Sequence, residues 1–176
     1  MILTFITKCN RGKEMNDPDF IICGAQKAGT TSLLRYLRSH PEIFMPNKEV
    51  HFFDRNYLKG LEWYKSQFAD NSVSIKVYGE KCPEYMYLEN VPERIYQNFP
   101  NIKLIFILRN PLERAYSGYW HEVKNGRENL PFEKAIKKEE ERLKSEEAYC
   151  KIHCSYIDRG KYIEQLKRFE YYFSKD

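Results

Sequence analysis

The sequence predicts an α/β fold of three layers, α/β/α, in which helices cover both faces of a central parallel sheet. Compact apolar runs at residues 19–25 and 103–109 are typical of buried strands. Patterns with helical periodicity separate the predicted strands, and strands that alternate with helices form parallel βαβ units. The 176 residues, 42% of them hydrophobic, suffice for one domain with a substantial core.

The predicted domain covers residues 18–176 and follows a polar, irregular segment at residues 1–17. Its first strand, DFIICGA at residues 19–25, ends at Gly24. A glycine-containing loop leads into a helix at residues 30–40, where three leucines share one face and a proline follows. The domain therefore opens with a strand, a loop and a helix.

Strands and helices continue to alternate through the middle of the chain. We expect an extended segment at residues 46–54, a short helix at 60–68, a strand at 74–80, a helix at 90–99 and the clearest buried strand at 103–109. This alternation of strands and helices predicts βαβ units and a parallel sheet.

Three more helices complete the predicted fold. Pro111 occupies the first turn of a helix that continues over residues 112–123. A charged helix at residues 131–148 offers i,i+4 ion pairs such as Glu140 with Lys144, and a final amphipathic helix covers residues 158–173. No strand follows this helix, so we expect the sheet to be incomplete.

Charge and cysteine content narrow the possible partners. The 29 basic and 25 acidic residues give a net charge of +4 without a long basic run, which argues against nucleic acid and favours a small anionic ligand. Five cysteines form no paired framework and indicate a reducing compartment. Cys150, His153 and Cys154 are too few for a typical structural zinc site, so free thiols are the simpler interpretation.

The N-terminal apolar run MILTFIT is too short for most signal peptides and for a membrane span. We therefore expect a soluble cytoplasmic protein without a membrane segment. If the chain is a piece of an anchored enzyme, the Golgi lumen is the alternative.

The stretch GAQKAGTTS, residues 24–32, predicts a P-loop-like anion site. Gly24 and Gly29 have the G-x-x-x-x-G spacing of nucleotide-phosphate loops, and Thr31 occupies the hydroxyl position. The usual lysine position is Thr30, whereas Lys27 lies three residues earlier. Backbone N–H groups at the start of the following helix favour an anion here.

A second departure from nucleoside triphosphatases is the absence of an acidic metal ligand. The strand at residues 103–109 ends in Arg109 instead of the aspartate that holds magnesium in such enzymes. Sulfuryl transfer suits a loop with a lysine and no metal, because the transferred group has less negative charge than a phosphoryl group. A P-loop kinase or NTPase is the weaker alternative.

Three segments resemble sulfotransferases that use 3′-phosphoadenosine 5′-phosphosulfate (PAPS), especially the heparan sulfate N- and 3-O-sulfotransferases and their bacterial relatives. They are GAQKAGTTS, HPEIFMPNKEVHFFD and LRNPLERAYSGY, and the resemblance extends from about Asp19 to Phe173. It implies that Lys27 contacts the bridging oxygen of PAPS and assists departure of the leaving group. The loop residues expected to bind the co-substrate are Gly24, Gln26, Lys27, Ala28, Gly29, Thr30, Thr31 and Ser32.

The motif R-x-P-x-x-R-x-x-S is matched by Arg109, Pro111, Arg114 and Ser117. The resemblance implies that Arg109 and Ser117 bind the 3′-phosphate of PAPS. Arg114 either joins them or forms a structural ion pair.

On the acceptor side, the resemblance implies that Glu49 is the base that deprotonates the acceptor. His51 is the alternative base, because its ordinary pKa lies nearer neutrality. A strand-like period of two would point Glu49 and His51 to one side. We expect His51 and Asp54 to support acceptor binding, and Lys81 to hold an anionic acceptor unless it is an ordinary surface lysine.

The predicted reaction is in-line transfer of a sulfuryl group from PAPS to a hydroxyl or amine, for instance of a carbohydrate. Family members are longer and continue beyond the helix at residues 158–173, so the C-terminal part of the domain is expected to be missing. A catalytically inert or nucleotide-binding fragment is therefore the alternative function. No sequence feature specifies the acceptor or an oligomeric state.

Overall fold

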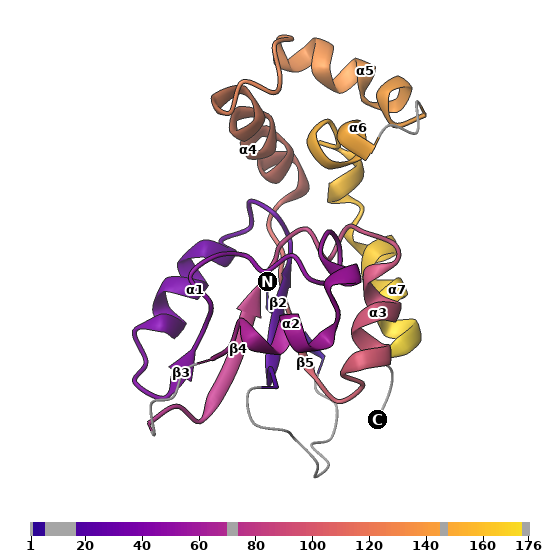
Figure 1. Cartoon of the computed structure of the whole chain (residues 1–176). Coiled ribbons are helices and arrows are strands. Elements are labelled where there is room, and N and C mark those ends of the chain that lie inside the picture. Colours follow the sequence, from indigo (N-terminus) through magenta and orange to yellow (C-terminus); the bar gives the residue numbers. More distant parts are fainter. Residues whose placement is uncertain (1, 6–16, 70–73, 145–147, 174–176) are drawn as a thin grey trace. The chain divides into compact units, whose positions relative to one another are not determined.

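The computed structural model describes residues 2–5, 17–69, 74–144 and 148–173 of the chain. The chain divides into two compact units with separate cores (Figure 1). The sheet unit comprises residues 1–108 and 164–176, and the helical unit comprises residues 109–163.

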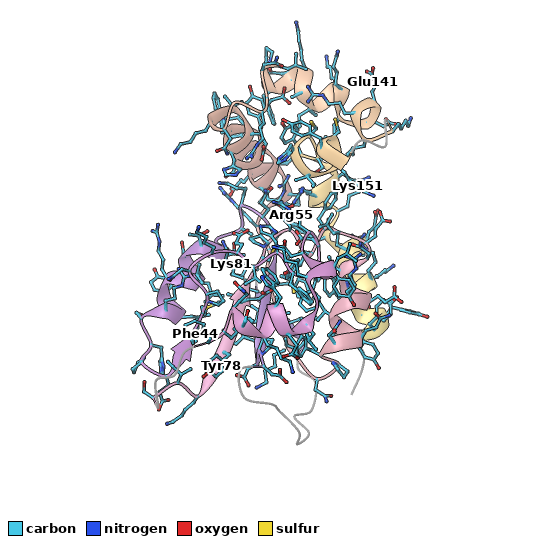
Figure 2. All side chains as sticks on the ribbon, in the orientation of Figure 1. Phe44, Arg55, Tyr78, Lys81, Glu141 and Lys151 are labelled. Carbon is cyan, nitrogen blue, oxygen red and sulfur yellow. The ribbon has the colours of Figure 1, made fainter. Side chains whose placement is uncertain are left out.

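The sheet unit is built on a five-stranded sheet with the order β1-β5-β2-β4-β3. Neighbouring strands are parallel except that β1 runs antiparallel to β5. At the β3 edge, the rings of Phe44 and Tyr78 lie 5.9 Å apart (Figure 2). The strands are β1 Ile2–Phe5, β2 Phe20–Gly24, β3 Ile43–Phe44, β4 Val77–Lys81 and β5 Lys103–Ile107.

Helices pack on both faces of this sheet. On one face, Phe20 and Ile22 of β2 pack against leucines of α1, Thr30–Arg38. On the other face, Phe106 of β5 contacts Phe169 of α7 with ring centroids 4.9 Å apart, since alternate strand residues face opposite sides. The predicted three-layer α/β/α arrangement is confirmed. The other helices of this unit are α2 Leu61–Ser66 and α3 Val91–Asn98, and α7 covers Tyr162–Tyr172.

The helical unit contains α4 Pro111–Lys124, α5 Phe132–Lys144 and α6 Ala148–His153. The Asn110 side chain caps α4 by accepting hydrogen bonds from the N–H groups of Leu112 and Glu113, at 3.0 and 3.4 Å. Arg114 is buried and donates to the carbonyl oxygen of Tyr156, so it has a structural contact within this unit.

Three expectations about local structure are corrected. Residues 2–5 form β1, although the segment 1–17 was expected to be irregular, because this brief apolar run pairs with β5 and becomes an edge strand of the sheet. Residues 6–16 lie outside the described part. The segment 46–54 is not extended to its end: residues 52–55 form a turn, which begins after a left-handed backbone at His51.

The last correction concerns the charged helix at residues 131–148. It ends as α5 at Lys144, residues 145–147 lie outside the described part, and a separate helix, α6, begins at Ala148. The expected ion pair between Glu140 and Lys144 is confirmed at 2.7 Å. Within the described ranges, none of the helices combines the length and hydrophobicity that crossing a bilayer requires.

Candidate functional site

The glycine loop, residues 24–32, joins β2 to α1 at the carboxyl end of the central strand. Gly24 cannot be replaced without movement, because an added Cβ would lie 2.7 Å from the Cβ of Met86. Gly29 is the N-cap of α1 with φ 102°, and an added Cβ there would meet no atom within 4 Å. The N–H groups at the start of α1 make this helix end positive, and the first turn of the helix contains no acidic side chain to offset that charge.

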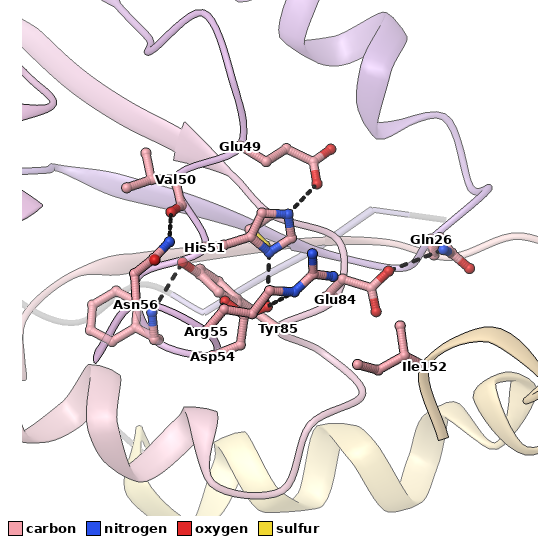
Figure 3. A network of polar contacts seen from close by, with 12 residues as sticks. Gln26, Glu49, Val50, His51, Asp54, Arg55, Asn56, Glu84, Tyr85 and Ile152 are labelled. Atoms are coloured by element: carbon pink, nitrogen blue, oxygen red, sulfur yellow. Dashed lines mark hydrogen bonds and ion pairs between the residues drawn. The ribbon is translucent and has the colours of Figure 1, made fainter. Parts of the chain in front are cut away.

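Lys27 has a left-handed backbone with φ 66°, an uncommon conformation for a residue with a side chain. The tight turn around it is closed by the N–H of Ala28, which donates to the carbonyl of Ala25 at 3.1 Å. Gln26 donates to Glu84 at 3.1 Å and ties the loop to the segment after β4 (Figure 3). Strained non-glycine residues concentrate at functional sites, so this conformation supports a specific task for Lys27.

The His51 turn, residues 51–56, places a chain of ionisable groups beside the loop. His51 Nδ1 lies 2.8 Å from Asp54 Oδ2, and its Nε2 lies 3.3 Å from Glu49 Oε2 (Figure 3). Lys81 Nζ lies 2.5 Å from the other oxygen of Glu49 and 3.5 Å from Thr31 Oγ1 of the loop. The expected acceptor-side residues Glu49, His51 and Asp54 therefore lie together, and Lys81 connects Glu49 to the loop hydroxyl.

Burial and hydrogen bonding give these groups defined charges. Burial alone would lower the pKa of His51, but the hydrogen bonds to Asp54 and Glu49 outweigh burial and raise this pKa to about 9. Burial would raise the pKa of Glu49, but hydrogen bonds from His51 and Lys81 lower it overall. At neutral pH the site contains an imidazolium between two carboxylates.

Lys81 is more enclosed than an acceptor-gripping surface lysine would be. Lys81, labelled in Figure 2, is only 9% exposed. Its ammonium group contacts Glu49 and Thr31. The lysine thereby connects the acceptor side to the glycine loop. Its expected contact with an anionic acceptor stays a prediction.

The sequence analysis assigned no role to Cys82, which follows Lys81. The distance from Cys82 Sγ to His51 Nδ1 is 3.2 Å. Burial raises the pKa of the Cys82 thiol well above its ordinary value, so it is neutral. Ligand atoms of Glu49, His51 and Cys82 lie within 4.8 Å of one another, close enough for a cation. Two of these side chains already have charged partners outside the cluster, since Glu49 contacts Lys81 and His51 contacts Asp54.

Arg109 and Ser117, the expected 3′-phosphate ligands, belong to the helical unit. Arg109 Nε lies 3.0 Å from Glu113 Oε2 in the first turn of α4, and Ser117 is half-buried on the same helix. Both follow the β5 strand in the chain, as the motif requires. Their role towards a nucleotide stays a prediction.

The glycine loop fits an anionic phosphosulfate group by three local observations. The space above Gly29 is open, the helix end is positive, and the hydroxyl of Thr31 lies 3.5 Å from a lysine ammonium. The N–H groups at the helix end, the hydroxyl of Thr31 and the nearby ammonium group are donors that phosphate oxygens accept from. The loop residues therefore fit the 5′ end of PAPS.

Comparison with known proteins agrees with this geometry. A family model described as a sulfotransferase domain matches residues 17–176. The chain is 37% identical over 162 residues to heparan sulfate glucosamine 3-O-sulfotransferase 5 of Mus musculus, a match that covers 89% of this chain and 45% of that protein. It is 41% identical over 102 residues to heparan sulfate glucosamine 3-O-sulfotransferase 6 of Homo sapiens, covering 58% and 30%.

A solved structure is similar as well. The crystal structure of a sulfotransferase from Alicyclobacillus acidocaldarius superposes with a TM-score of 0.77 at 33% identity, over 90% of this chain and 70% of that one. The chain spans about half the length of the curated relatives that it matches. Both the sequence match and the shared fold show that this chain belongs to the family of sulfotransferase domains.

Proposed function

We propose that this protein transfers a sulfuryl group from PAPS to a hydroxyl or amine group of a carbohydrate. The observation that supports the proposal best is the chain of contacts from Asp54 through His51, Glu49 and Lys81 to Thr31 of the glycine loop. It connects a carboxylate able to accept a proton with a loop able to hold an anion.

In this proposal Glu49 accepts the acceptor proton while the acceptor oxygen or nitrogen bonds to sulfur and the P–O–S bridge breaks. PAPS supplies the sulfuryl group and leaves as adenosine 3′,5′-bisphosphate. Lys27 stabilises the negative charge that develops on the bridging oxygen, and the N–H groups of Gly29, Thr30 and Thr31 hold the 5′-phosphate. Arg109 and Ser117 hold the 3′-phosphate.

The charges in the site favour Glu49 over His51 as the base. With its pKa raised to about 9, His51 is protonated at neutral pH and has no lone pair to accept a proton. Glu49 is ionised, and His51 and Lys81 keep it in place. The low pKa of Glu49 makes it a weak base in this arrangement, so a shift of Lys81 on acceptor binding would strengthen it.

The names of the relatives support the carbohydrate acceptor. Each of the two mammalian proteins above is named for 3-O-sulfation of heparan sulfate glucosamine. We therefore propose an anionic, heparan-like oligosaccharide as the acceptor class, with Lys81 as one of its contacts. We propose that the protein works in the compartment that contains this acceptor, so identifying the acceptor also tests the compartment.

The test is a transfer assay with 35S-labelled PAPS and the purified protein. N-sulfated and N-unsubstituted heparan oligosaccharides serve as acceptors and separate hydroxyl from amine transfer. We expect labelled oligosaccharide with the native protein, and a decrease of about 10²–10⁴-fold for Glu49→Gln, the range for loss of a general base. Glu62→Gln, an exposed glutamate of α2, is the matched control and should keep full activity.

Failure to label any of these acceptors, although adenosine 3′,5′-bisphosphate stabilises the protein in a thermal-shift experiment, would contradict the proposed activity and indicate nucleotide binding alone. Stabilisation by Mg-ATP without stabilisation by the bisphosphate would instead support a P-loop kinase or NTPase.

A further inference from the structure

The His51 turn is held by an arginine from a helix about forty residues further along the chain. Arg94 of α3 donates from Nη1 to the carbonyl oxygens of Phe53, at 2.8 Å, and Asp54, at 3.3 Å. One charged donor therefore binds both peptide groups that flank the Asp54 side chain. Hydrogen bonds from a charged group are stronger than neutral ones, so this contact restricts the path of the turn.

The turn needs such external support because of its own backbone. His51 has φ 52°, which is unfavourable for a residue with a Cβ. Inside the turn, the His51 carbonyl accepts from the N–H groups of Arg55 and Asn56, at 3.2 and 2.9 Å. On the opposite side, the N–H of Phe53 donates to the hydroxyl of Tyr85 at 3.3 Å. Contacts from α3 and from the segment after β4 thus hold the two sides of the turn.

Arg94 is itself fixed in place. Its guanidinium lies over the ring of Tyr57, 4.4 Å from the ring centroid. Asn98 of the same helix donates to the Tyr57 hydroxyl at 3.1 Å and to the Arg94 carbonyl at 2.8 Å. The side chain is half-buried, so solvent competes only weakly for its donors. Because Arg94 is held in this way, its guanidinium fixes the backbone of the His51 turn relative to α3.

We propose that Arg94 is a positioning residue of the sulfotransferase site, which orients Asp54 so that Asp54 holds His51 and His51 holds Glu49. Only the expected change in transfer rate rests on the proposed function, whereas the expected change in the pKa of His51 does not. Arg94 contacts the turn backbone, so it acts through Asp54 and His51 on the proton-accepting carboxylate. The ionisable groups that face His51 are Glu49, Asp54, Arg55, Glu80 and Cys82.

The experiment compares Arg94→Ala and Arg94→Lys with a matched arginine. Arg168 of α7 is also half-buried and donates to a loop carbonyl, that of Tyr87, at 2.9 Å, rather than to the backbone of the His51 turn. Arg168→Ala therefore controls for the loss of a comparable structural hydrogen bond. For each variant, the pKa of His51 is measured by NMR, with His51→Asn to assign the resonance, and kcat and acceptor KM are measured in the transfer assay.

We expect Arg94→Ala to lower the pKa of His51 by about one unit or more from its value of about 9, because the hydrogen bond that His51 donates to Asp54 is loosened. The kcat should fall by about 10–100-fold with little change in acceptor KM or in affinity for adenosine 3′,5′-bisphosphate. Arg94→Lys keeps the charge but not the planar guanidinium. Its His51 pKa and its kcat should lie between those of the native protein and those of Arg94→Ala. Arg168→Ala should leave the pKa of His51 and kcat unchanged.

An unchanged pKa of His51 in Arg94→Ala, or in Arg94→Lys if the alanine variant does not fold, would overturn the positioning role even if activity fell. Equal losses of kcat in the Arg94 and Arg168 variants would also overturn it. If the protein transfers no sulfuryl group, the proposed function fails, whereas the NMR comparison still decides whether Arg94 holds the turn.

Discussion

The glycine loop and the His51 turn both contain a non-glycine residue with a left-handed backbone, Lys27 at φ 66° and His51 at φ 52°, but different parts of the chain hold them. In the loop, neighbouring residues close the turn around Lys27: the N–H of Ala28 donates to the carbonyl of Ala25, and Gly29 leads into α1. In the turn, the side chains of Arg94 and Tyr85, distant in sequence, bind the backbone. The backbone of the glycine loop is therefore set largely by neighbouring residues, whereas that of the His51 turn depends on the assembled core.

The largest expected effect tests the loop. Lys27→Ala should reduce the transfer rate by about 10²–10³-fold, the cost of losing one donor aimed at charge that develops in the transition state. Single-turnover kinetics measure this step. Affinity for adenosine 3′,5′-bisphosphate, measured by calorimetry, should change little because the loop N–H groups remain. A variant that kept full transfer activity would remove Lys27 from the proposed mechanism.

The next effect tests the turn. Asp54→Asn keeps the shape of the side chain but removes the charge beside His51, so the pKa of His51 should fall from about 9 towards its ordinary value. We expect the transfer rate to fall by about 10–100-fold, because His51 then holds Glu49 less firmly. NMR titration and initial-rate measurements check both results. If His51 titrated at the same pH in this variant, its contact with Asp54 would have no electrostatic role.

A third effect separates the turn from the loop by pH. Burial raises the pKa of Glu80 to about 8, despite the Tyr85 and Tyr64 hydroxyls beside it, and ion pairs raise that of His51 to about 9. Both pKa values are higher in the folded protein than in the unfolded chain. Between about pH 5 and pH 9 the folded protein therefore binds more protons than the unfolded chain.

Stability should therefore be highest in mildly acidic solution and decline from about pH 5 to pH 9. Thermal unfolding across this range measures the decline. Glu80→Gln should flatten its lower part and His51→Asn its upper part, while Lys27→Ala should leave the profile unchanged. A profile that rose with pH would contradict the charge assignments of the turn.

A smaller effect tests the local encoding of the loop. Gly29→Ala introduces no clash, since no atom lies within 4 Å of the added Cβ, but φ 102° is unfavourable for alanine. The free energy of unfolding should decrease by about 1–2 kcal/mol. Denaturant titration measures it, with Gly126→Ala in the helical unit, at φ 68°, as a control that also has a positive φ but lies outside the loop. A decrease confined to Gly126→Ala would show that the loop relaxes without cost.

The smallest effect, none, is expected for metal removal. If Glu49, His51 and Cys82 handle protons, treatment with a chelator should not change the transfer rate. Loss of activity that Zn²⁺ restores would show that these three side chains bind a cation instead.

Much of the fold could be predicted because its signals are local. The strand up to Gly24, the helix from Thr30 and the proline-initiated helix α4 follow from apolar periodicity and from glycine and proline positions. The strand β1 was missed because its four residues gain a hydrogen-bonding partner only from β5, about a hundred positions later. The loop residues were predicted from glycine spacing and from the family resemblance, and the acceptor-side group of Glu49, His51 and Asp54 mainly from the resemblance. Their roles stay predictions.

By itself, the sequence determined the strand, glycine loop and helix around the displaced lysine, the proline-initiated helix α4 and the family resemblance, since these depend on spacing along the chain. Only the tertiary structure decided which charges meet: Lys81 with Glu49 and Thr31, Cys82 with His51, and Arg94 with the backbone of the turn. The physical reason is that hydrogen bonds and ion pairs act over a few ångströms. Residues far apart in the sequence come within that range only when the sheet and its helices have packed.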